Sequence, residues 1–317
     1  MKKIIVYGLG KQFEEHRQWI ENAYCIIGYC DSDVEKLKEF EPTVRVEGIS
    51  GLEYDFILIT SSNVIYISEI TQQLLSYGIQ RRKIKILQYE ESMQGVLGVC
   101  PKVVSWSGMW EDLVIDRIFT NLDIDYNDMR YIELGVMDPV IANNTFYFYQ
   151  HGAKGVLVEA NPGLIENIKF MRPRDVVMNK AVYAEDANEI SFFVSENPGL
   201  SSLKSNWSEQ EENWKKYKQT EEIKVPTIHI NDVFELLESK CNLLSIDIEG
   251  YDYEALQSLN FCKHRPQVII VELLWGGEHT KDSNRITQLL LDQGYLLYAR
   301  NQCNGIFYDK CFQDKLQ

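Results

Sequence analysis

The chain has no long apolar run. Its clearest apolar stretch, Val268–Trp275, contains Glu272 and is far shorter than the roughly 20 residues that a membrane helix needs. The start, with Lys2 and Lys3 before an apolar run, resembles a signal peptide, but Lys11 follows at once. We therefore expect a cytoplasmic protein without a membrane span.

Metal-binding cysteine motifs and an excess of positive charge are also missing. The seven cysteines are odd in number, and none forms C-x-x-C or a Cys/His cluster with zinc-ligand spacing, so we expect reduced thiols. The 32 Lys and Arg residues against 47 Asp and Glu residues give a net charge of −15. A nucleic acid or an anionic membrane would be repelled by this charge. With 45% apolar and 25% charged residues, the composition is that of a folded globular protein.

Short β-branched runs alternate with helical patterns over roughly the first 90 residues, which predicts βαβ units and a small Rossmann-like module. The predicted strands are Lys3–Tyr7, Cys25–Cys30, Phe56–Thr60 and Lys83–Leu87, and the predicted helices are Phe13–Ala23 and Val64–Tyr77. The second helix follows Ser61-Ser62-Asn63, a set of residues typical of an N-cap.

The pattern loosens between Glu90 and Ser107, around Gly95, Gly98 and Pro101. Glycine and proline interrupt regular structure, so we predict a linker there. The predicted domains are residues 1–98, the Rossmann-like module, and residues 99–317.

A second strand and helix series follows the linker. After a helix at Trp110–Leu122, the predicted strands are Tyr131–Gly135, Val156–Ala160, Val176–Val182, Leu243–Ile248 and Val268–Leu274. Tyr295–Arg300 and Gly305–Asp309 predict a closing antiparallel hairpin, with Asn304-Gly305 at its turn. A polar stretch between Trp207 and Glu222 has aromatic residues at helical spacing, which favours an amphipathic helix over a substrate lid. The fold class is α/β with two Rossmann-like domains, the second having the sheet of class I methyltransferases.

The first candidate site is Gly8-Leu9-Gly10 after the first strand, with Asp31 after the second. In a dinucleotide-binding fold such glycines admit a pyrophosphate and the acid accepts from a ribose. Phe13 stands where the third glycine of G-x-G-x-x-G belongs. The pattern leaves open a tight structural turn, an NAD site and a nucleotide-sugar site.

The second candidate site is Glu133-Leu134-Gly135, with Glu159 at the end of the next strand. Gly135 would permit a ligand to approach the backbone, and Glu159 stands where an acid can accept both hydroxyls of a ribose. This spacing suits an adenosine-containing cofactor, although a solvated carboxylate at a strand end remains the alternative for Glu159.

The third candidate site is Asp247-Ile248-Glu249, where a period of two places both acids on one face at the carboxyl end of a strand. Glu272 ends the following strand. These carboxylates could take a proton from a hydroxyl, hold a divalent cation or bind a cofactor ammonium group. The structural alternative is that Glu249 caps the next helix and Asp247 pairs with a lysine.

Four ordered segments together resemble the FkbM family of S-adenosylmethionine-dependent methyltransferases over about residues 130–275. They are Tyr131-Ile-Glu-Leu-Gly with the residues up to Thr145, Gly155-Val-Leu-Val-Glu-Ala-Asn-Pro, Gly199-Leu-Ser-Ser-Leu, and Leu244-Ser-Ile-Asp-Ile-Glu-Gly. The resemblance implies a class I fold that transfers a methyl group, typically to a hydroxyl of a sugar or a related natural product. It places Glu133 and Gly135 on the cofactor loop, Glu159 at the ribose, and Asp247 with Glu249 on the Asp-x-Glu-Gly motif. Glu133 stands where the family usually has Asp.

We expect Asp247 to serve as general base and also to contact the cofactor, with Glu249 and His279 as further catalytic candidates. Asn144, Ser201 and Glu272 are expected to contact the acceptor. Whether Glu278, His279 and Asp247 hold Mg²⁺ or Mn²⁺ stays open at this point.

Two other functions compete with methyl transfer. The first domain could make the protein an NAD-dependent sugar oxidoreductase, or the chain could be a nucleotide-sugar-binding protein. The expected partner is a small-molecule or nucleotide-linked sugar and not a nucleic acid, and a homo-oligomer is compatible with the sequence.

Overall fold

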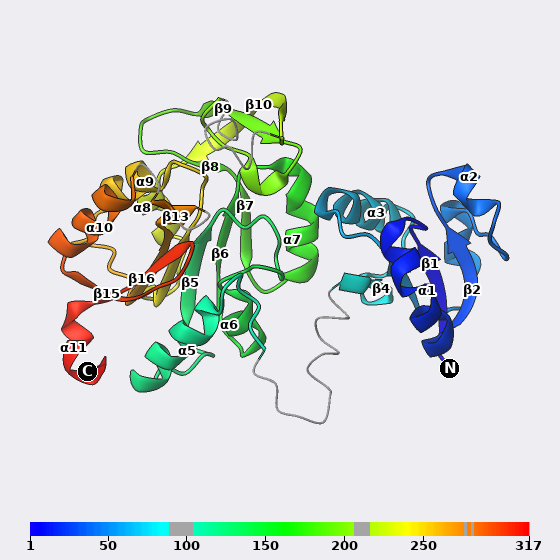
Figure 1. Ribbon diagram of the computed structural model, residues 1–317, viewed down its shortest axis with the longest axis horizontal. Helices are drawn as coiled ribbons and strands as arrows, with labels where there is room; N and C mark the ends of the chain where they lie inside the picture. Colours follow the sequence, from blue (N-terminus) through cyan, green and yellow to red (C-terminus); the bar gives the residue numbers. More distant parts are fainter. Residues whose placement is uncertain (89–103, 206–215, 276–277, 280–281, 317) are drawn as a thin grey trace. The chain divides into compact units, whose positions relative to one another are not determined.

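The computed structural model describes residues 1–88, 104–205, 216–275, 278–279 and 282–316 (Figure 1). The contacts within the chain divide it into two compact units, Met1–Val104 and Ser105–Gln317. The predicted boundary between residues 98 and 99 lies outside the described residues. Within those described, none of the helices combines the length and the apolar character needed to cross a membrane.

The first unit is built on a four-stranded, wholly parallel sheet with the order β2-β1-β3-β4. Its elements are β1 (Lys3–Tyr7), α1 (Lys11–Ala23), β2 (Cys25–Cys30), α2 (Val34–Leu37), η1 (Val46–Gly51), β3 (Phe56–Ile59), α3 (Val64–Ser76), η2 (Arg81–Lys83) and β4 (Ile84–Ile86). The four predicted strands and both predicted helices are confirmed within a few residues. The Asn63 side chain accepts hydrogen bonds from the first turn of α3, as the N-cap prediction requires.

The second unit contains a seven-stranded sheet and helices on both of its faces. Its first half comprises α5 (Glu111–Asn121), β5 (Arg130–Leu134), α6 (Phe146–Gln150), β6 (Lys154–Glu159), η3 (Pro162–Leu164), α7 (Ile165–Met171), β7 (Val176–Asn179), β8 (Ala181–Val182), β9 (Glu189–Ser195) and η4 (Pro198–Leu200). Its second half comprises β10 (Gln219–Ile228), α8 (Ile230–Phe234), β11 (Leu243–Ile246), α9 (Asp252–Ser258), β12 (Val268–Glu272), β13 (Leu274–Trp275), β14 (Glu278–His279), α10 (Ser283–Asp292), β15 (Tyr295–Arg300), β16 (Asn304–Asp309), η6 (Lys310–Phe312) and α11 (Gln313–Leu316).

The strand order of the large sheet is β15-β16-β12-β11-β5-β6-β7. The five strands from β12 to β7 are parallel, and β16 pairs antiparallel with both β12 and β15. This confirms the predicted parallel sheet that ends in an antiparallel hairpin. The order reverses between β5 and β11, and the crevice at such a reversal is where ligands bind in open α/β sheets.

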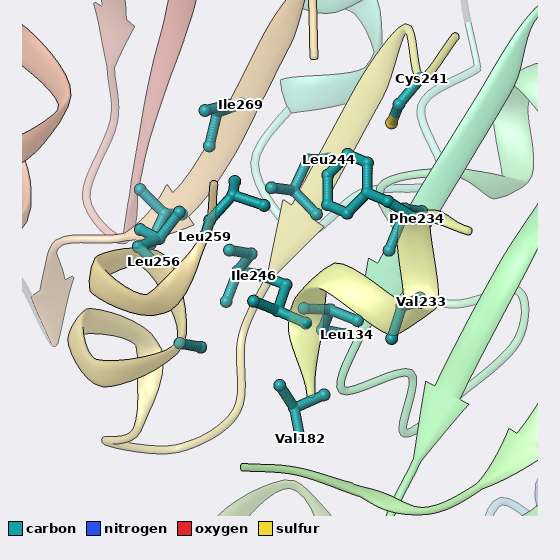
Figure 2. Close-up of a cluster of buried hydrophobic side chains, with 14 of the residues drawn as sticks. Leu134, Val182, Val233, Phe234, Cys241, Leu244, Ile246, Leu256, Leu259 and Ile269 are labelled. Carbon is teal, nitrogen blue, oxygen red and sulfur yellow. The ribbon is translucent and has the colours of Figure 1, made fainter. Parts of the chain in front are cut away.

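One face of this sheet is covered by apolar side chains from α8, α9 and α10. Figure 2 shows part of this core, in which Leu134, Leu244 and Ile246 of the strands lie near Val233 of α8 and Leu256 of α9. Because side chains alternate along a strand, the opposite face of β5 presents Tyr131 and Glu133, both of which are buried. The face of the sheet opposite α8, α9 and α10 therefore has polar groups that lie in the interior.

Two details of the predicted strands and their connections are wrong. The predicted strand Val176–Val182 is split, because the chain leaves the large sheet after Asn179 and Ala181–Val182 pairs with β10. Asn304-Gly305 begins β16 and is not the hairpin turn, which is held by the Asn301 carboxamide accepting from the backbone amides of Cys303 and Asn304. Gly305 serves packing, since a Cβ there would lie 2.4 Å from Leu273 Cδ1.

The helix predicted between Trp207 and Glu222 is wrong for the part of this stretch that the structure describes. Residues 206–215 lie outside the described part of the chain, but Gln219–Glu222 belongs to β10. These residues pair antiparallel with β9, with Glu222 opposite Phe193. Cross-strand pairing thus determines the conformation of this polar segment, although its spacing of aromatic residues favours a helix.

Candidate active site

A cavity with a volume of about 200 Å³ lies at the carboxyl ends of β5, β6 and β11. Its lining comes from three regions: the loop after β5, the segment from Glu159 to Val182, and the turn after β11, with β9 and η4 residues completing the wall. Seven of the sequence-predicted site residues line it: Glu133, Gly135, Asn144, Glu159, Ser201, Asp247 and Glu249. Residues from separate parts of the sequence therefore meet at the point where the strand order reverses.

Gly135 allows the two central strands to approach each other at the cavity. Its φ is +80°, and a Cβ at this position would lie 1.7 Å from the Asp247 carbonyl oxygen. A side chain at residue 135 would therefore clash with the backbone that follows β11. The close contact is therefore between two backbone segments, and the approach of a ligand at Gly135 stays a prediction.

Backbone strain is concentrated around the same cavity. Five non-glycine residues in the described part of the chain have a positive φ, and three of them, Met137, Ala142 and Glu249, line the cavity. Such conformations cost about 1–3 kcal/mol each and persist where the surrounding structure enforces them. Strain at a functional site is common, and this distribution supports the cavity as the site.

Glu159 holds the loop that follows β5. One of its carboxylate oxygens accepts from the amides of Val136 at 3.0 Å and Met137 at 3.1 Å, and the other accepts from the amide of Asn161 at 2.7 Å. Burial raises the pKa of Glu159, and these backbone amides counteract the rise. The solvated carboxylate that was the alternative prediction is wrong, since the side chain is buried.

Glu133 is a buried carboxylate within a network of polar side chains. Its Oε2 accepts from Thr145 Oγ1 at 2.7 Å and from Asn143 Nδ2 at 3.1 Å. Burial raises the pKa of Glu133 to about 7, while the charge of Arg172 opposes the rise. Its ionisation therefore falls in the neutral range.

Asp247 lies just beyond the end of β11, where its amide donates to the Leu134 carbonyl at 3.0 Å. Burial, followed by the charges of Asp252 and Glu133, raises the pKa of Asp247 to about 7. A carboxylate with such a pKa can accept a proton near neutral pH. The role of Asp247 as a general base stays a prediction.

The predicted alternation of Asp247 and Glu249 along one strand face is wrong. The strand ends at Ile246, and Glu249 has a φ of +51°, so the two acids lie on a turn and not on a pleated strand. This turn is held by Asp252, whose carboxylate accepts from the amides of Ile248 at 3.1 Å and Gly250 at 3.2 Å. Asp252 thus holds the turn that precedes α9, whose N-cap residue is Tyr251.

The other predicted residues are placed as follows. Asn144 Nδ2 donates to Ser245 Oγ at 3.2 Å, and Ser201 Oγ accepts from the Ser195 amide at 3.0 Å. Glu272 ends β12 and does not line the cavity, but burial and the nearby charges of Asp247 and Glu249 raise its pKa. The backbone of His279 lies in β14, paired with β13.

Two lining residues, Lys180 and Phe192, belong to no motif by which the sequence analysis could find them. Lys180 lies between β7 and β8, and Phe192 comes from β9, a strand outside the large sheet. Among the described residues, no group of three or more His, Cys, Asp and Glu side chains is arranged to hold a metal ion.

In the first unit, the acid predicted to bind a ribose is engaged by the protein itself. Asp31 accepts from the amide of Leu9 at 2.6 Å and from that of Asp33 at 2.8 Å. Phe13 is buried against Tyr29 and Phe40. These contacts give Gly8-Leu9-Gly10 a structural role in a turn, while a ligand there stays a prediction.

Comparisons with known proteins assign a family to most of the second unit. Residues 123–297, more than half of the chain, match the methyltransferase FkbM domain, and residues 1–85 match the N-terminal domain of C2185-like proteins. No curated protein matches the chain.

Similar solved structures include an O-methyltransferase from Bacillus cereus in complex with SAH and a TehB-like SAM-dependent methyltransferase from Corynebacterium glutamicum. The first has 11% identity and a TM-score of 0.35, covering 77% of this chain and 98% of its own. The second has 10% identity and a TM-score of 0.35, covering 70% and 97%. These TM-scores are low, and the family assignment rests on the matched domain. The chain belongs to the FkbM family of methyltransferases and is S-adenosylmethionine-dependent.

Proposed function

We propose that this chain transfers a methyl group from S-adenosylmethionine to a hydroxyl of a sugar or of a related natural-product precursor. The observation that carries the proposal is the buried Asp247 carboxylate, with a pKa raised to about 7, at the cavity between β5 and β11. A hydroxyl acceptor must lose a proton, and this carboxylate can take it near neutral pH.

The residues around the cavity fit the cofactor chemically. When bound, S-adenosylmethionine supplies a methyl group on a positively charged sulfur. The carboxylates of Glu133 and Asp247 line the cavity and complement that charge. Glu159 lines the same cavity, and its carboxylate is the proposed acceptor for a ribose hydroxyl.

Asn144 and Ser201 are the proposed acceptor contacts, because both line the same cavity as Asp247. Asp247 accepts the acceptor's proton on its carboxylate. Glu249 and Glu272 add negative charge near this carboxylate, and the charges of Asp247 and Glu249 in turn raise the pKa of Glu272. The negative charge of these carboxylates favours the binding of a proton, which supports the use of Asp247 as a base.

The test uses the full chain with methyl-labelled S-adenosylmethionine and a panel of free sugars and nucleotide-linked sugars. We expect label on a sugar oxygen, located by NMR, and loss of transfer by about 100-fold or more in Asp247→Asn. Asp186→Asn, at an exposed position, is the matched control. Label on carbon or nitrogen, or wild-type transfer by Asp247→Asn, would contradict the proposal.

A further inference from the structure

Arg172 is a fully buried cation directly behind the cavity residue Glu133. It follows the last residue of α7, has an exposed fraction of 0%, and lies between the sheet and the loop after β5. Its five N–H donors all have partners in the protein: Asp175, the Pro139 carbonyl, Asn143 Oδ1, the Tyr131 hydroxyl and Thr145 Oγ1, at 2.7–3.1 Å. The guanidinium therefore fixes the orientation of every side chain around it.

The contact between Arg172 and Thr145 determines which acceptor the Thr145 hydroxyl donates its hydrogen bond to. A guanidinium can only donate, so Thr145 Oγ1 accepts from Arg172 Nη2 at 2.7 Å. The hydroxyl's single hydrogen is then free to point to Glu133 Oε2, also at 2.7 Å, and the alternative acceptor Asn143 Oδ1 is farther away at 3.2 Å. Thr145 is therefore a donor to Glu133.

The contact with Asn143 has the same effect. Asn143 Oδ1 accepts from Arg172 Nη1 at 3.1 Å and from the amides of Thr145 and Phe146. This identifies the oxygen end of the carboxamide, so its Nδ2 group faces Glu133 Oε2 at 3.1 Å and the Asp138 carbonyl at 3.0 Å. Glu133 Oε2 thus accepts two hydrogen bonds, which favour the ionised form of this carboxyl group.

We propose that Arg172 is a positioning residue for the cofactor: through Thr145 and Asn143 it keeps Glu133 a carboxylate at the cavity wall, and so sets the affinity for a positively charged ligand. The inference rests on the proposed function, because it needs Glu133 to face the cofactor.

The charges around Glu133 define the expected pH dependence. Arg172 favours the ionised form, whereas Asp175 and Asp247 oppose it, and burial opposes it most. With these effects combined, the pKa of Glu133 is raised to about 7. Loss of the donors on Oε2 would raise it further, so that a higher pH would be needed to bind a cation.

The test measures the affinity of the full chain for S-adenosylmethionine and for S-adenosylhomocysteine by calorimetry, between about pH 6 and pH 9. In the wild type, affinity for S-adenosylmethionine should rise with pH to a plateau. In Thr145→Val the midpoint should move up by about one pH unit, with affinity about tenfold lower at pH 7, because one unit of pKa corresponds to a tenfold change. S-adenosylhomocysteine lacks the sulfonium charge and should respond less.

Three further variants make the result specific. Thr145→Ser retains the hydroxyl and should keep the wild-type profile, while in a Glu133→Gln background the change Thr145→Val should no longer shift the midpoint. If Arg172→Met folds, it should shift the midpoint of the affinity profile at least as far as Thr145→Val does. If it does not fold, the comparison of Thr145→Val with Thr145→Ser tests the inference.

The inference is overturned if Thr145→Val lowers affinity equally at all pH values, or if Thr145→Ser behaves like Thr145→Val. In either case the network is merely structural, while the proposed function stands. If the wild type binds neither ligand, the proposed function fails together with the inference.

Discussion

Gly135 is the residue at which the geometry of the site can be tested most simply. Its φ is +80°, and a Cβ placed on it would lie 1.7 Å from the Asp247 carbonyl oxygen, which excludes any side chain without a shift of the backbone. We expect Gly135→Ala to lose at least about 1–3 kcal/mol of stability and to lose cofactor binding. Gly108→Ala is the matched control, because no atom lies within 4 Å of a Cβ there. Unchanged melting and binding of Gly135→Ala would refute the close approach.

Asp247 should make the protein less stable as the pH rises. Its pKa is about 7 in the folded chain, above the value of 3.8 for a free side chain, so the folded state holds a proton that the unfolded chain releases. Stability is therefore lost as the pH rises from about 4 to 7. At pH 8, Asp247→Asn should have a free energy of unfolding larger than that of the wild type by on the order of 1–2 kcal/mol, and so melt at a higher temperature. At pH 4 the two proteins should have nearly the same stability. Thermal unfolding at both pH values, with Asp186→Asn as control, checks the sign.

Single residues of the site were predictable only where a strand pattern or a motif marked them. Glu133 and Glu159 end strands that are evident from their apolar runs, and both line the cavity. Arg172 could not be found in this way, since its partners are up to 41 residues away in the sequence. Its role depends on a tertiary network that no local spacing records.

At the scale of elements, Glu159 joins the loop after β5 to the start of η3. Glutamine in its place keeps the shape but turns an NH₂ group toward backbone donors, so at least one amide loses its acceptor. We expect Glu159→Gln to lower the free energy of unfolding by about 1–3 kcal/mol. Glu166→Gln, on the partly exposed surface of α7, should have little effect. Equal stability of the two variants in denaturant titrations would contradict this role.

The strands could be predicted because they are short apolar runs, whereas their ends and connections depend on contacts between distant segments. Asn179 Nδ2 donates to the carbonyls of Glu159 and Ala160, where the chain leaves the large sheet. Likewise the hairpin turn is determined by Asn301, although Asn304-Gly305 is the more common turn pair. Asn301 and Asn304-Gly305 lie within five residues of each other and both favour a turn. Which of them forms the turn depends on the pairing of β16 with β15.

At the scale of the whole molecule, the two units should respond differently to ligands. S-adenosylhomocysteine at about 100 times its dissociation constant should stabilise the chain by about 2.7 kcal/mol, which corresponds to a rise of about 5–11 °C in melting temperature for a unit of this size. NAD⁺ should have no effect, because Asp31 of the first unit is engaged with backbone amides. A shift with NAD⁺ alone would assign the function to the first unit.

The most direct test of the central claim is a calorimetric titration of the full chain with S-adenosylhomocysteine. We expect one site per chain in the wild type, in Gly108→Ala and in Gly10→Ala, a change in the first unit where a Cβ meets no atom within 4 Å. Folded Gly135→Ala should show no binding. Binding that survives in Gly135→Ala but is lost in Gly10→Ala would place the cofactor in the first unit and contradict this claim.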